Sequence, residues 1–205
     1  EKSRPIYVKL PQGAKDAIYT RDILWVQGQL DGEKVNVFVN HWPSRSGGEK
    51  RSEPGRMAAA TTLRKFLDSL NIIYPETKSI VMGDLNDDPV NNSITVGLRA
   101  KGDVKKLKPE ELFNPWSDYF KSGLGTLAYQ DSWSLFDQII ISQDWLDKKQ
   151  TGFFYYKNNV FKPEFMIESF GQYKGYPKRT YSGDVYNYGY SDHFPTYLVM
   201  LKKVQ

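Results

Sequence analysis

The chain has 205 residues, of which 40% are hydrophobic and 15% aromatic, so it can bury the core of one substantial domain. Its net charge of +4 and pI of about 9.0 are a mild basic bias, which allows a polyanionic substrate but does not require one. The lack of cysteine excludes disulfides and thiolate metal sites. No apolar stretch is long enough to span a bilayer, and no signal peptide is visible at Glu1.

The first part of the chain predicts antiparallel strands. Apolar residues within 1–12 alternate as in an exposed strand. Residues 22–30 and 34–40 are two further strand candidates. Asp31 and Gly32 separate them and are a strong signal for a tight hairpin turn. We therefore expect these two strands to pair side by side.

A loop and a long helix are expected next. Residues 46–55 are rich in glycine, serine and charge, which is typical of a loop. From Pro54 or Gly55 onward, apolar residues recur at helical spacing and predict one buried stripe. The stripe consists of Ala60, Leu63, Leu67 and Leu70, while Arg64, Lys65 and Asp68 fall outside it. The helix leads into a strand at residue 79, which gives the order β-β-α-β.

The strand at 79–89 combines a short apolar run with a polar end. The run stops at Gly83 and is followed by acidic and amide side chains, which indicates a buried strand that delivers polar groups to a loop. Because one residue separates them, Asp84 and Asn86 leave extended backbone on the same side. They could hold a water, a magnesium ion or a phosphate oxygen. The alternative is an Asx-rich turn with no further role.

The patterns are looser in the second half of the chain. Short helices are expected at 91–99 and 109–120, with a solvated basic segment at 101–108 between them. Strands are expected at 125–129, 135–142 and 194–201. Residues 157–190 are aromatic and irregular, with glycine and proline interruptions. Since the sequence shows no repeat and no linker, we expect one mixed α/β domain over residues 1–205.

The sequence contains two histidines, and each adjoins an expected strand end. His41 follows the 34–40 strand, and His193 precedes the last strand with Asp192 beside it. Asp137 lies inside an apolar run, where an unpaired carboxylate would be costly. An imidazole N–H is a natural partner for such a buried carboxylate. A structural pair with lysine, arginine or a backbone N–H is the alternative.

Four motifs, taken together, carry a resemblance to a known family. They are Asn40-His41-Trp42-Pro43-Ser44-Arg45, Gly83-Asp84-Leu85-Asn86-Asp87-Asp88-Pro89, Trp133-Ser134-Leu135-Phe136-Asp137-Gln138-Ile139 and Ser191-Asp192-His193. From about Thr20 to the C-terminus the chain resembles the endonuclease/exonuclease/phosphatase superfamily, which includes deoxyribonuclease I, abasic-site endonucleases, inositol polyphosphate phosphatases and bacterial sphingomyelinases. The resemblance implies a four-layer α/β sandwich of two mostly antiparallel β-sheets flanked by helices. It also implies divalent-metal-dependent hydrolysis of a phosphate ester.

The start of the chain departs from the family pattern. Members of the family begin with a strand that bears an asparagine, followed by a strand that bears a metal-binding glutamate, and neither is found before Asp22. The resemblance therefore implies that the N-terminal part of the fold is missing. A separate N-terminal chain that completes the fold, or an inactive fragment, is then expected. A secreted or periplasmic location is expected for the same reason, because an export signal could precede Glu1.

The resemblance also implies roles for individual residues. Asp192 resembles a ligand or a nearby acceptor for the metal, which would be Mg²⁺ or Mn²⁺. Asp84 resembles the residue that orients or deprotonates the attacking water, Asn86 resembles a donor to water or phosphate, and both could also contact the metal. Asp137 resembles the partner that orients His193 and favours its imidazolium form.

Two residues and the substrate complete the expected site. His41 resembles a donor to a phosphate oxygen or to the leaving group, and Arg45 could add a bidentate phosphate contact. The basic segments at 101–108 and 174–179 are modest for a duplex-DNA nuclease. Tyrosines within 153–190 could stack bases or a sugar, or could pack the edge of the core. Three functions stay open: a phosphodiesterase such as a nuclease, a phosphomonoesterase or phospholipid hydrolase, and a catalytically inactive binding fragment.

Overall fold

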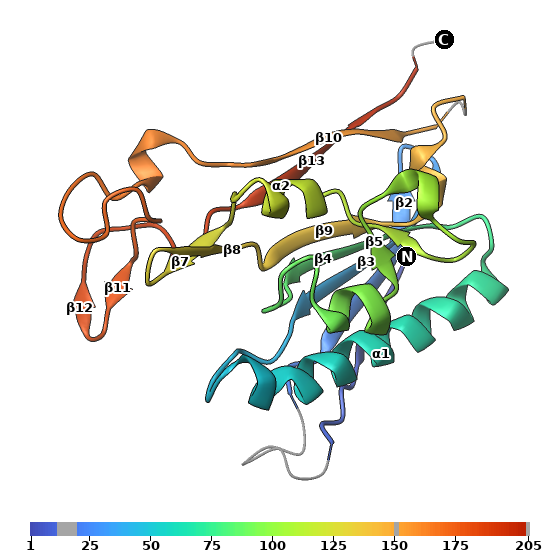
Figure 1. Ribbon diagram of the computed structural model, residues 1–205. Helices are drawn as coiled ribbons and strands as arrows, with labels where there is room; N and C mark the ends of the chain where they lie inside the picture. Colours follow the sequence, from blue (N-terminus) through green and yellow to red (C-terminus); the bar gives the residue numbers. More distant parts are fainter. Residues whose placement is uncertain (12–19, 150–151, 204–205) are drawn as a thin grey trace.

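A computed structural model describes residues 1–11, 20–149 and 152–203. Its main element is a seven-stranded sheet (Figure 1). The strands lie in the order β1 (Lys2–Ile6), β2 (Ile23–Leu30), β3 (Glu33–His41), β4 (Lys78–Asp84), β9 (Asp137–Ile141), β6 (Leu112–Phe113) and β5 (Ala100–Lys101). A second sheet pairs β10 (Phe154–Val160) with β13 (Thr196–Leu201). Two small hairpins join β7 (Leu127–Tyr129) to β8 (Ser132–Ser134) and β11 (Tyr181–Ser182) to β12 (Val185–Tyr186).

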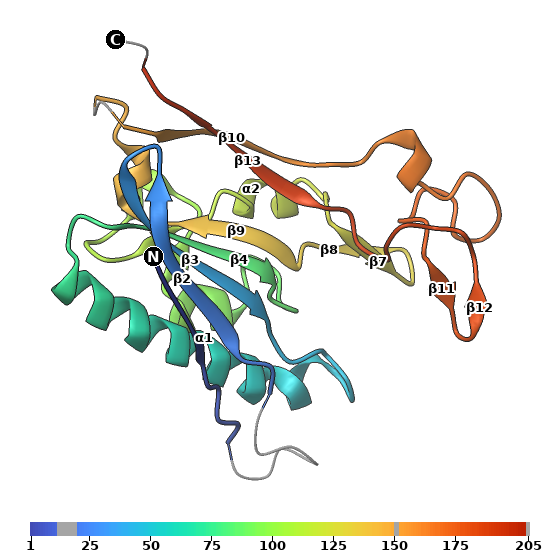
Figure 2. The same cartoon turned by 180° about the vertical axis from the view of Figure 1, so that it is seen from behind.

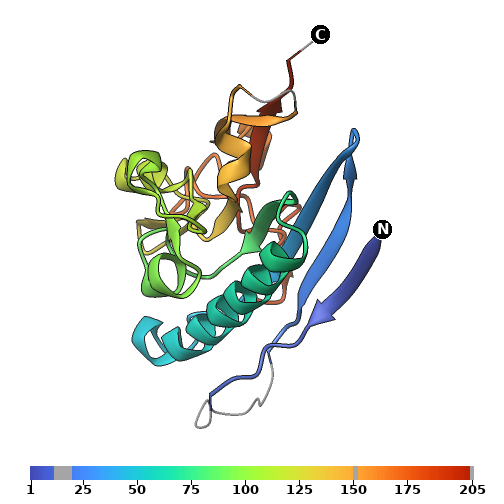
Figure 3. The same ribbon diagram turned by 90° about the vertical axis from the view of Figure 1, so that its right-hand side faces the viewer.

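The helix α1 (Glu49–Ile73) covers one face of the large sheet, and the β10–β13 sheet covers the other (Figures 1 and 3). The shorter helical segments are α2 (Ser117–Lys121), a π-helical turn η1 (Ser93–Gly97) and the 3₁₀ turns η2 (Val104–Lys106), η3 (Gln143–Leu146) and η4 (Glu164–Met166). None of the described helices is both long and apolar enough to cross a membrane. The prediction was a four-layer α/β sandwich of two mostly antiparallel sheets flanked by helices. It is confirmed as an α/β fold dominated by its sheets, with α1 as the helix that covers the large sheet.

The central strands are buried on both faces. In β3, Phe38 packs in the cluster beneath α1, whereas Val35 packs in the cluster between the two sheets. In β9, Ile140 packs in the cluster beneath α1 and Ile141 packs in the cluster between the two sheets. Burial on both faces explains the continuous apolar runs of β4 and β9, at 80–82 and 139–141.

The start of the chain agrees with its sequence pattern in most respects. β1 pairs with β2, and β2 pairs with β3, both antiparallel. Asp31 and Gly32 have φ values of 47° and 84°, as a two-residue hairpin turn with both central residues left-handed requires. The exposed strand expected at 1–12 is present as β1, but Ile6 and Val8 are buried in the core. Residue 12 lies outside the described part of the chain.

The helix α1 has the predicted buried stripe but begins earlier than predicted. Ala60, Leu63, Leu67 and Leu70 are all buried. The helix starts at Glu49 rather than near Pro54, which lies in its second turn. Its first turn is held by Arg56, which donates hydrogen bonds to the carbonyl oxygen of Glu49 (3.0 Å) and to Ser52 Oγ (2.7 Å). The glycines, serines and proline of this segment predicted a loop. The hydrogen bonds of Arg56 stabilise a helix there instead.

Arg64 also differs from its prediction, because it is buried although the helical pattern places it outside the stripe. Its guanidinium donates hydrogen bonds to Asp68 Oδ1 (2.7 Å) and to the carbonyl oxygen of Glu110 (3.2 Å). These partners satisfy the charge of Arg64 at a position where an unpaired arginine would be costly.

The second half of the chain contains the largest differences. The helix predicted at 109–120 is wrong for most of its length, because Leu112–Phe113 pairs as β6 and α2 starts only at Ser117. The strand β10 occupies part of the segment expected to be irregular, and pairing with the distant β13 stabilises it. The strands expected at 125–129, 135–142 and 194–201 are present as β7, β9 and β13, and the helix expected at 91–99 is the turn η1.

Candidate active site

Three of the predicted site residues form one row across adjacent strands. β3 and β4 are parallel, and their register sets His41 opposite Asp84. β9 is antiparallel to β4, and its register sets Asp137 opposite Asp84. Side chains at paired positions on one face of a sheet are neighbours, so His41, Asp84 and Asp137 lie side by side at one end of the sheet. Figure 2 shows the two small hairpins projecting beyond this end.

His193 joins this row from the loop that precedes β13. Its Nδ1 lies 2.7 Å from Asp137 Oδ2. The two side chains are 20% and 21% exposed. The loop is fixed by the N–H of Phe194, which donates to the carbonyl oxygen of Thr126 (2.7 Å). The structure therefore brings together both histidines and two of the predicted aspartates from segments far apart in the sequence.

The electrostatics of the site favour a charged imidazole and a less acidic carboxyl. Burial lowers the pKa of His193, but the hydrogen bond to Asp137 and the charges of Asp137, Asp84 and Asp192 outweigh it, so the pKa of His193 is raised. Burial raises the pKa of Asp84, and the charge of Asp137 adds to this increase. The Asn86 N–H and both imidazoles only partly oppose the shift.

His41 is the most open member of the row. Its Nε2 lies 3.6 Å from Asp84 Oδ2, and its side chain is 49% exposed. An exposed imidazole beside a partly buried carboxylate can reach a bound molecule from the solvent side.

Asn86 and Asp192 are placed differently from each other. Asn86 is buried in a turn with φ 50°, where its N–H donates to Asp84 Oδ1 (2.9 Å) and its Nδ2 donates to the carbonyl oxygen of Trp42 (3.0 Å). It therefore holds Asp84 and ties the loop after β4 to the loop after β3. Asp192 is exposed and adds negative charge beside His193.

Arg45 points into a cluster of acidic side chains behind the site. Its Nη2 lies 3.2 Å from Asp87 Oδ1 and 3.0 Å from Asp88 Oδ2, and its Nε donates to the carbonyl oxygen of Asn86 (3.0 Å). Asp87 also lies 2.7 Å from Nε of Arg56, whose side chain is fully buried. The guanidinium of Arg45 thus supports the loop that carries Asp84. The sequence shows these charges, but it gives no sign of which ones pair.

Gly83 is a positioning residue that the sequence reasoning did not single out. Its φ is +131°, and a Cβ at this position would lie 2.0 Å from the carbonyl oxygen of Asn40. Only glycine allows β4 to lie this close to β3 just before Asp84. A glycine inside a strand pattern, directly before an acidic residue, is the signal that could have found it.

The site offers oxygen donors for a metal but no complete cage. In residues 1–11, 20–149 and 152–203, no group of three or more His, Cys, Asp and Glu side chains is arranged to hold a metal ion. Mg²⁺ is commonly bound through one or two carboxylates, with waters and substrate phosphate as its other ligands. The carboxylates of Asp84 and Asp192 both contribute negative charge at His193.

The fold and this site define a class of protein: an α/β sandwich that presents carboxylates and imidazoles at one end of its larger sheet, as hydrolytic enzymes do. A sequence profile of the Endonuclease/Exonuclease/phosphatase family matches residues 2–202. The chain belongs to this family, and the resemblance seen in its motifs is confirmed. Nucleases and phosphatases, which the family name covers, hydrolyse phosphate esters.

Solved structures with the same fold include three that cover nearly all of this chain. A mannosyl-6-phosphatase of Bacteroides thetaiotaomicron VPI-5482 covers 98% of this chain and 66% of its own length, with a TM-score of 0.59 at 16% identity. D. rerio TDP2 complexed with a single-strand DNA product covers 98% and 68%, with a TM-score of 0.57 at 15% identity. A humanized D. rerio TDP2 covers 98% and 65%, with a TM-score of 0.51 at 14% identity.

These structures are longer than the chain, which spans 65% to 68% of their length. At such low identity the likeness shows the fold alone. The comparisons give no support to a separate N-terminal chain that completes the fold. No curated protein sequence was found to match.

Proposed function

We propose that this protein hydrolyses phosphate esters in a reaction that depends on a divalent metal ion, with a phosphodiester such as a nucleic acid as the first candidate substrate. The observation that carries the proposal is the row of His41, Asp84 and Asp137 with His193 bonded to its end. It gathers one less acidic carboxylate and two imidazoles on one rim, which are the groups needed to move protons and to stabilise a phosphoryl anion.

Each side chain then has a separate task. Asp84 accepts a proton from the attacking water, which its place between His41 and Asp137 in the row allows it to reach. Asp137 fixes the orientation of His193, whose imidazolium donates a hydrogen bond to a phosphoryl oxygen as charge develops there. His41 gives a proton to the leaving oxygen as the phosphorus–oxygen ester bond breaks, so that the water adds and the alcohol leaves neutral.

The metal would be Mg²⁺ or Mn²⁺, held by the carboxylates of Asp84 and Asp192. Asn86 lies in the same loop as Asp84 and would hold that carboxylate in place. When bound, the metal supplies positive charge that offsets the anionic phosphate. Because Arg45 is engaged by Asp87 and Asp88, its part is to support this loop rather than to contact the substrate.

A phosphomonoester is the second candidate substrate. Solved structures of the same fold are described both as a mannosyl-6-phosphatase and as TDP2 with a single-strand DNA product, so this fold accommodates monoester and nucleic-acid phosphates. Release of phosphate from a nucleotide or a sugar phosphate, without cleavage of a supercoiled plasmid, would favour the monoester. A phospholipid is tested separately with a sphingomyelin vesicle, and release of phosphocholine is the readout.

The proposal is tested with the full chain and bis-p-nitrophenyl phosphate, in Mg²⁺, in Mn²⁺ and in EDTA. We expect hydrolysis only with metal, and a loss of about 10²–10⁴-fold in kcat/KM for His193→Ala and for Asp84→Ala. Asp118→Ala is the matched control, since this exposed aspartate forms an ion pair with Lys121 and has no part in the row of site residues. Hydrolysis that survives both substitutions would overturn the assignment, and failure to bind Mg²⁺ or Mn²⁺ in calorimetry would favour an inactive binding protein.

A further inference from the structure

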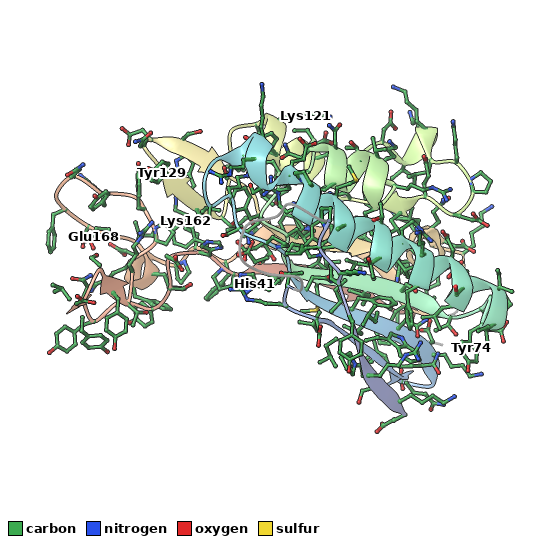
Figure 4. The ribbon with its side chains drawn as sticks, turned by 90° about the horizontal axis from the view of Figure 1, so that it is seen from below. His41, Tyr74, Lys121, Tyr129, Lys162 and Glu168 are labelled. Atoms are coloured by element: carbon green, nitrogen blue, oxygen red, sulfur yellow. The ribbon has the colours of Figure 1, made fainter. Side chains whose placement is uncertain are left out.

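A large cavity lies at the hairpin end of the molecule and has no part in the proposed chemistry. It has a volume of about 1020 Å³ and lies between the β7–β8 hairpin and the segment 168–187. Aromatic rings line it, namely Tyr129, Phe170, Tyr173 and Tyr176. Figure 4 shows Tyr129 and Glu168, two of its lining residues, at the end of the molecule beyond His41.

The cavity is connected directly to the loop that carries His193. Phe194 stacks on Trp133, with ring centroids 6.2 Å apart, and Trp133 contacts Tyr176 at 5.9 Å. The carbonyl oxygen of Lys178, another lining residue, accepts hydrogen bonds from the N–H groups of Tyr190 (2.8 Å) and Ser191 (3.4 Å). A ligand in the cavity would therefore lie next to the loop that carries His193.

The wall of the cavity is fixed before any ligand arrives. The hydroxyl of Tyr176 donates to Asp131 Oδ1 and accepts from the Asp131 N–H, both at 2.7 Å, which joins the β7–β8 hairpin to the facing segment. The N–H of Lys178 donates to the carbonyl oxygen of Met166 (2.8 Å). Walls held in this way avoid part of the ordering cost that a flexible site pays on binding.

Some of the rings remain largely open to solvent in spite of this support. Tyr129 is 70% exposed, Phe170 75% and Tyr173 58%. Exposed aromatic rings around a hollow, rather than scattered singly, are typical of a binding site. Their faces suit flat or C–H-rich ligands, such as nucleobases and sugar rings.

The charges of the lining distinguish between these ligands. Two acidic side chains, Asp131 and Glu168, are balanced by two basic ones, Lys178 and Arg179. Amide and hydroxyl groups complete the lining, namely Gln130, Gln172, Ser182 and Asn187. A groove for a nucleic-acid backbone is dominated by positive charge, whereas a neutral polyol needs donors and acceptors in similar number.

We propose that this cavity binds the sugar ring or rings of a phosphorylated carbohydrate, whose phosphate ester then reaches His193. The inference rests on the proposed hydrolysis of phosphate esters, and within it places a phosphorylated sugar ahead of a nucleic acid as the substrate. Tyr173 and Phe170 would stack on the sugar, and the polar lining would bond its hydroxyl groups. The volume exceeds what one hexose needs, so the ligand includes more than one ring or an attached aglycone.

The kinetic test compares a hexose 6-phosphate, a p-nitrophenyl ester of thymidine 5′-phosphate and glycerol phosphate, with the full chain and Mg²⁺. We expect Tyr173→Ala and Phe170→Ala each to raise KM for the hexose phosphate about tenfold with little change in kcat. Glycerol phosphate, which has no ring, should be unaffected. Tyr188→Ala is the matched control, because this tyrosine is 78% exposed but does not line the cavity.

Two results would overturn the inference: an increase in KM confined to the thymidine ester, or no increase for any substrate. Calorimetry with neutral maltotriose, cellotriose and mannotriose separates this inference from the proposed function. Binding of one trisaccharide that Tyr173→Ala weakens supports the sugar site even if no ester is hydrolysed. Absence of binding by all three would refute it even if hydrolysis of the simple esters is observed.

Discussion

Replacing Asp137 with asparagine separates two opposing effects on the pKa of His193, namely burial and negative charge. Burial lowers the pKa of His193, while the hydrogen bond to Asp137 and the neighbouring negative charges raise it and outweigh burial. Asparagine keeps the shape of the side chain but removes its charge, so that burial should then dominate. We expect the pKa of His193 to fall in Asp137→Asn.

The cost in stability follows from the geometry of the pair. A charge-assisted hydrogen bond of 2.7 Å between side chains that are only 20% and 21% exposed contributes about 1.5–3 kcal/mol to the free energy of unfolding. Because the folded-state pKa of His193 is raised, this contribution is fully present below the pKa of an unfolded imidazole, about 6.5. It is lost as the pH rises through the raised folded-state value. The difference between the native chain and the variant should therefore shrink in alkaline solution.

The assay uses the two histidines of the chain. Proton NMR of their ring Cε1–H signals in metal-free buffer gives both pKa values, and His41→Gln assigns them. Urea unfolding at a pH below and a pH above the pKa of His193 gives the difference in stability between the native chain and Asp137→Asn. Asp118→Asn is the control and should leave His193 unchanged. A raised pKa of His193 that persists in Asp137→Asn would refute the assignment of Asp137 as its cause.

Three further predictions concern the support of the site and its pH dependence. Gly83→Ala should lower the free energy of unfolding by at least about 3 kcal/mol, because its Cβ would meet the Asn40 carbonyl oxygen at 2.0 Å; an unchanged urea midpoint would contradict this. Arg56→Ala removes the 2.7 Å partner of the buried Asp87, which keeps its contacts with Arg45 and Ser93, and should cost about 1.5–3 kcal/mol in the same measurement; a near-neutral result would show that the pair is not structural. In metal-free buffer the carboxyl of Asp84 should titrate above the usual aspartate value, because it is buried and lies beside Asp137; a carbon-13 NMR titration that places its pKa at or below 3.8 would contradict this.

Local sequence signals predicted those parts of the fold that neighbouring residues determine. Asp31 and Gly32 fix the β2–β3 hairpin through their left-handed backbone, and the leucine and alanine spacing fixes the buried face of α1. The strand β10 could not be predicted in this way. Its sequence is polar and aromatic without clear alternation, and its pairing partner β13 lies about forty residues later. The early start of α1 likewise depends on Arg56, which satisfies carbonyl and hydroxyl groups one and two turns before it.

The candidate site could be predicted as a set of residues but not as an arrangement. Residue type and position at strand ends singled out His41, Asp84, Asp137 and His193. Their meeting depends on the register of three strands and on a loop more than fifty residues beyond β9. The ion pairs of Arg45 with Asp87 and Asp88 could not be predicted either, because the partners of a charged side chain are determined only in the folded chain. The compartment of the protein stays a prediction.

His41 lies opposite Asp84, and Asp84 lies opposite Asp137. Enzymatic activity therefore requires that the three strands pair in the correct register. A slip of one residue between β3 and β4 would turn one partner toward the opposite side of the sheet and dismantle the rim. During refolding, α1 can form from local contacts, whereas the parallel β3–β4 pair must close a long loop first. Turnover should therefore return later than the circular dichroism of the helix.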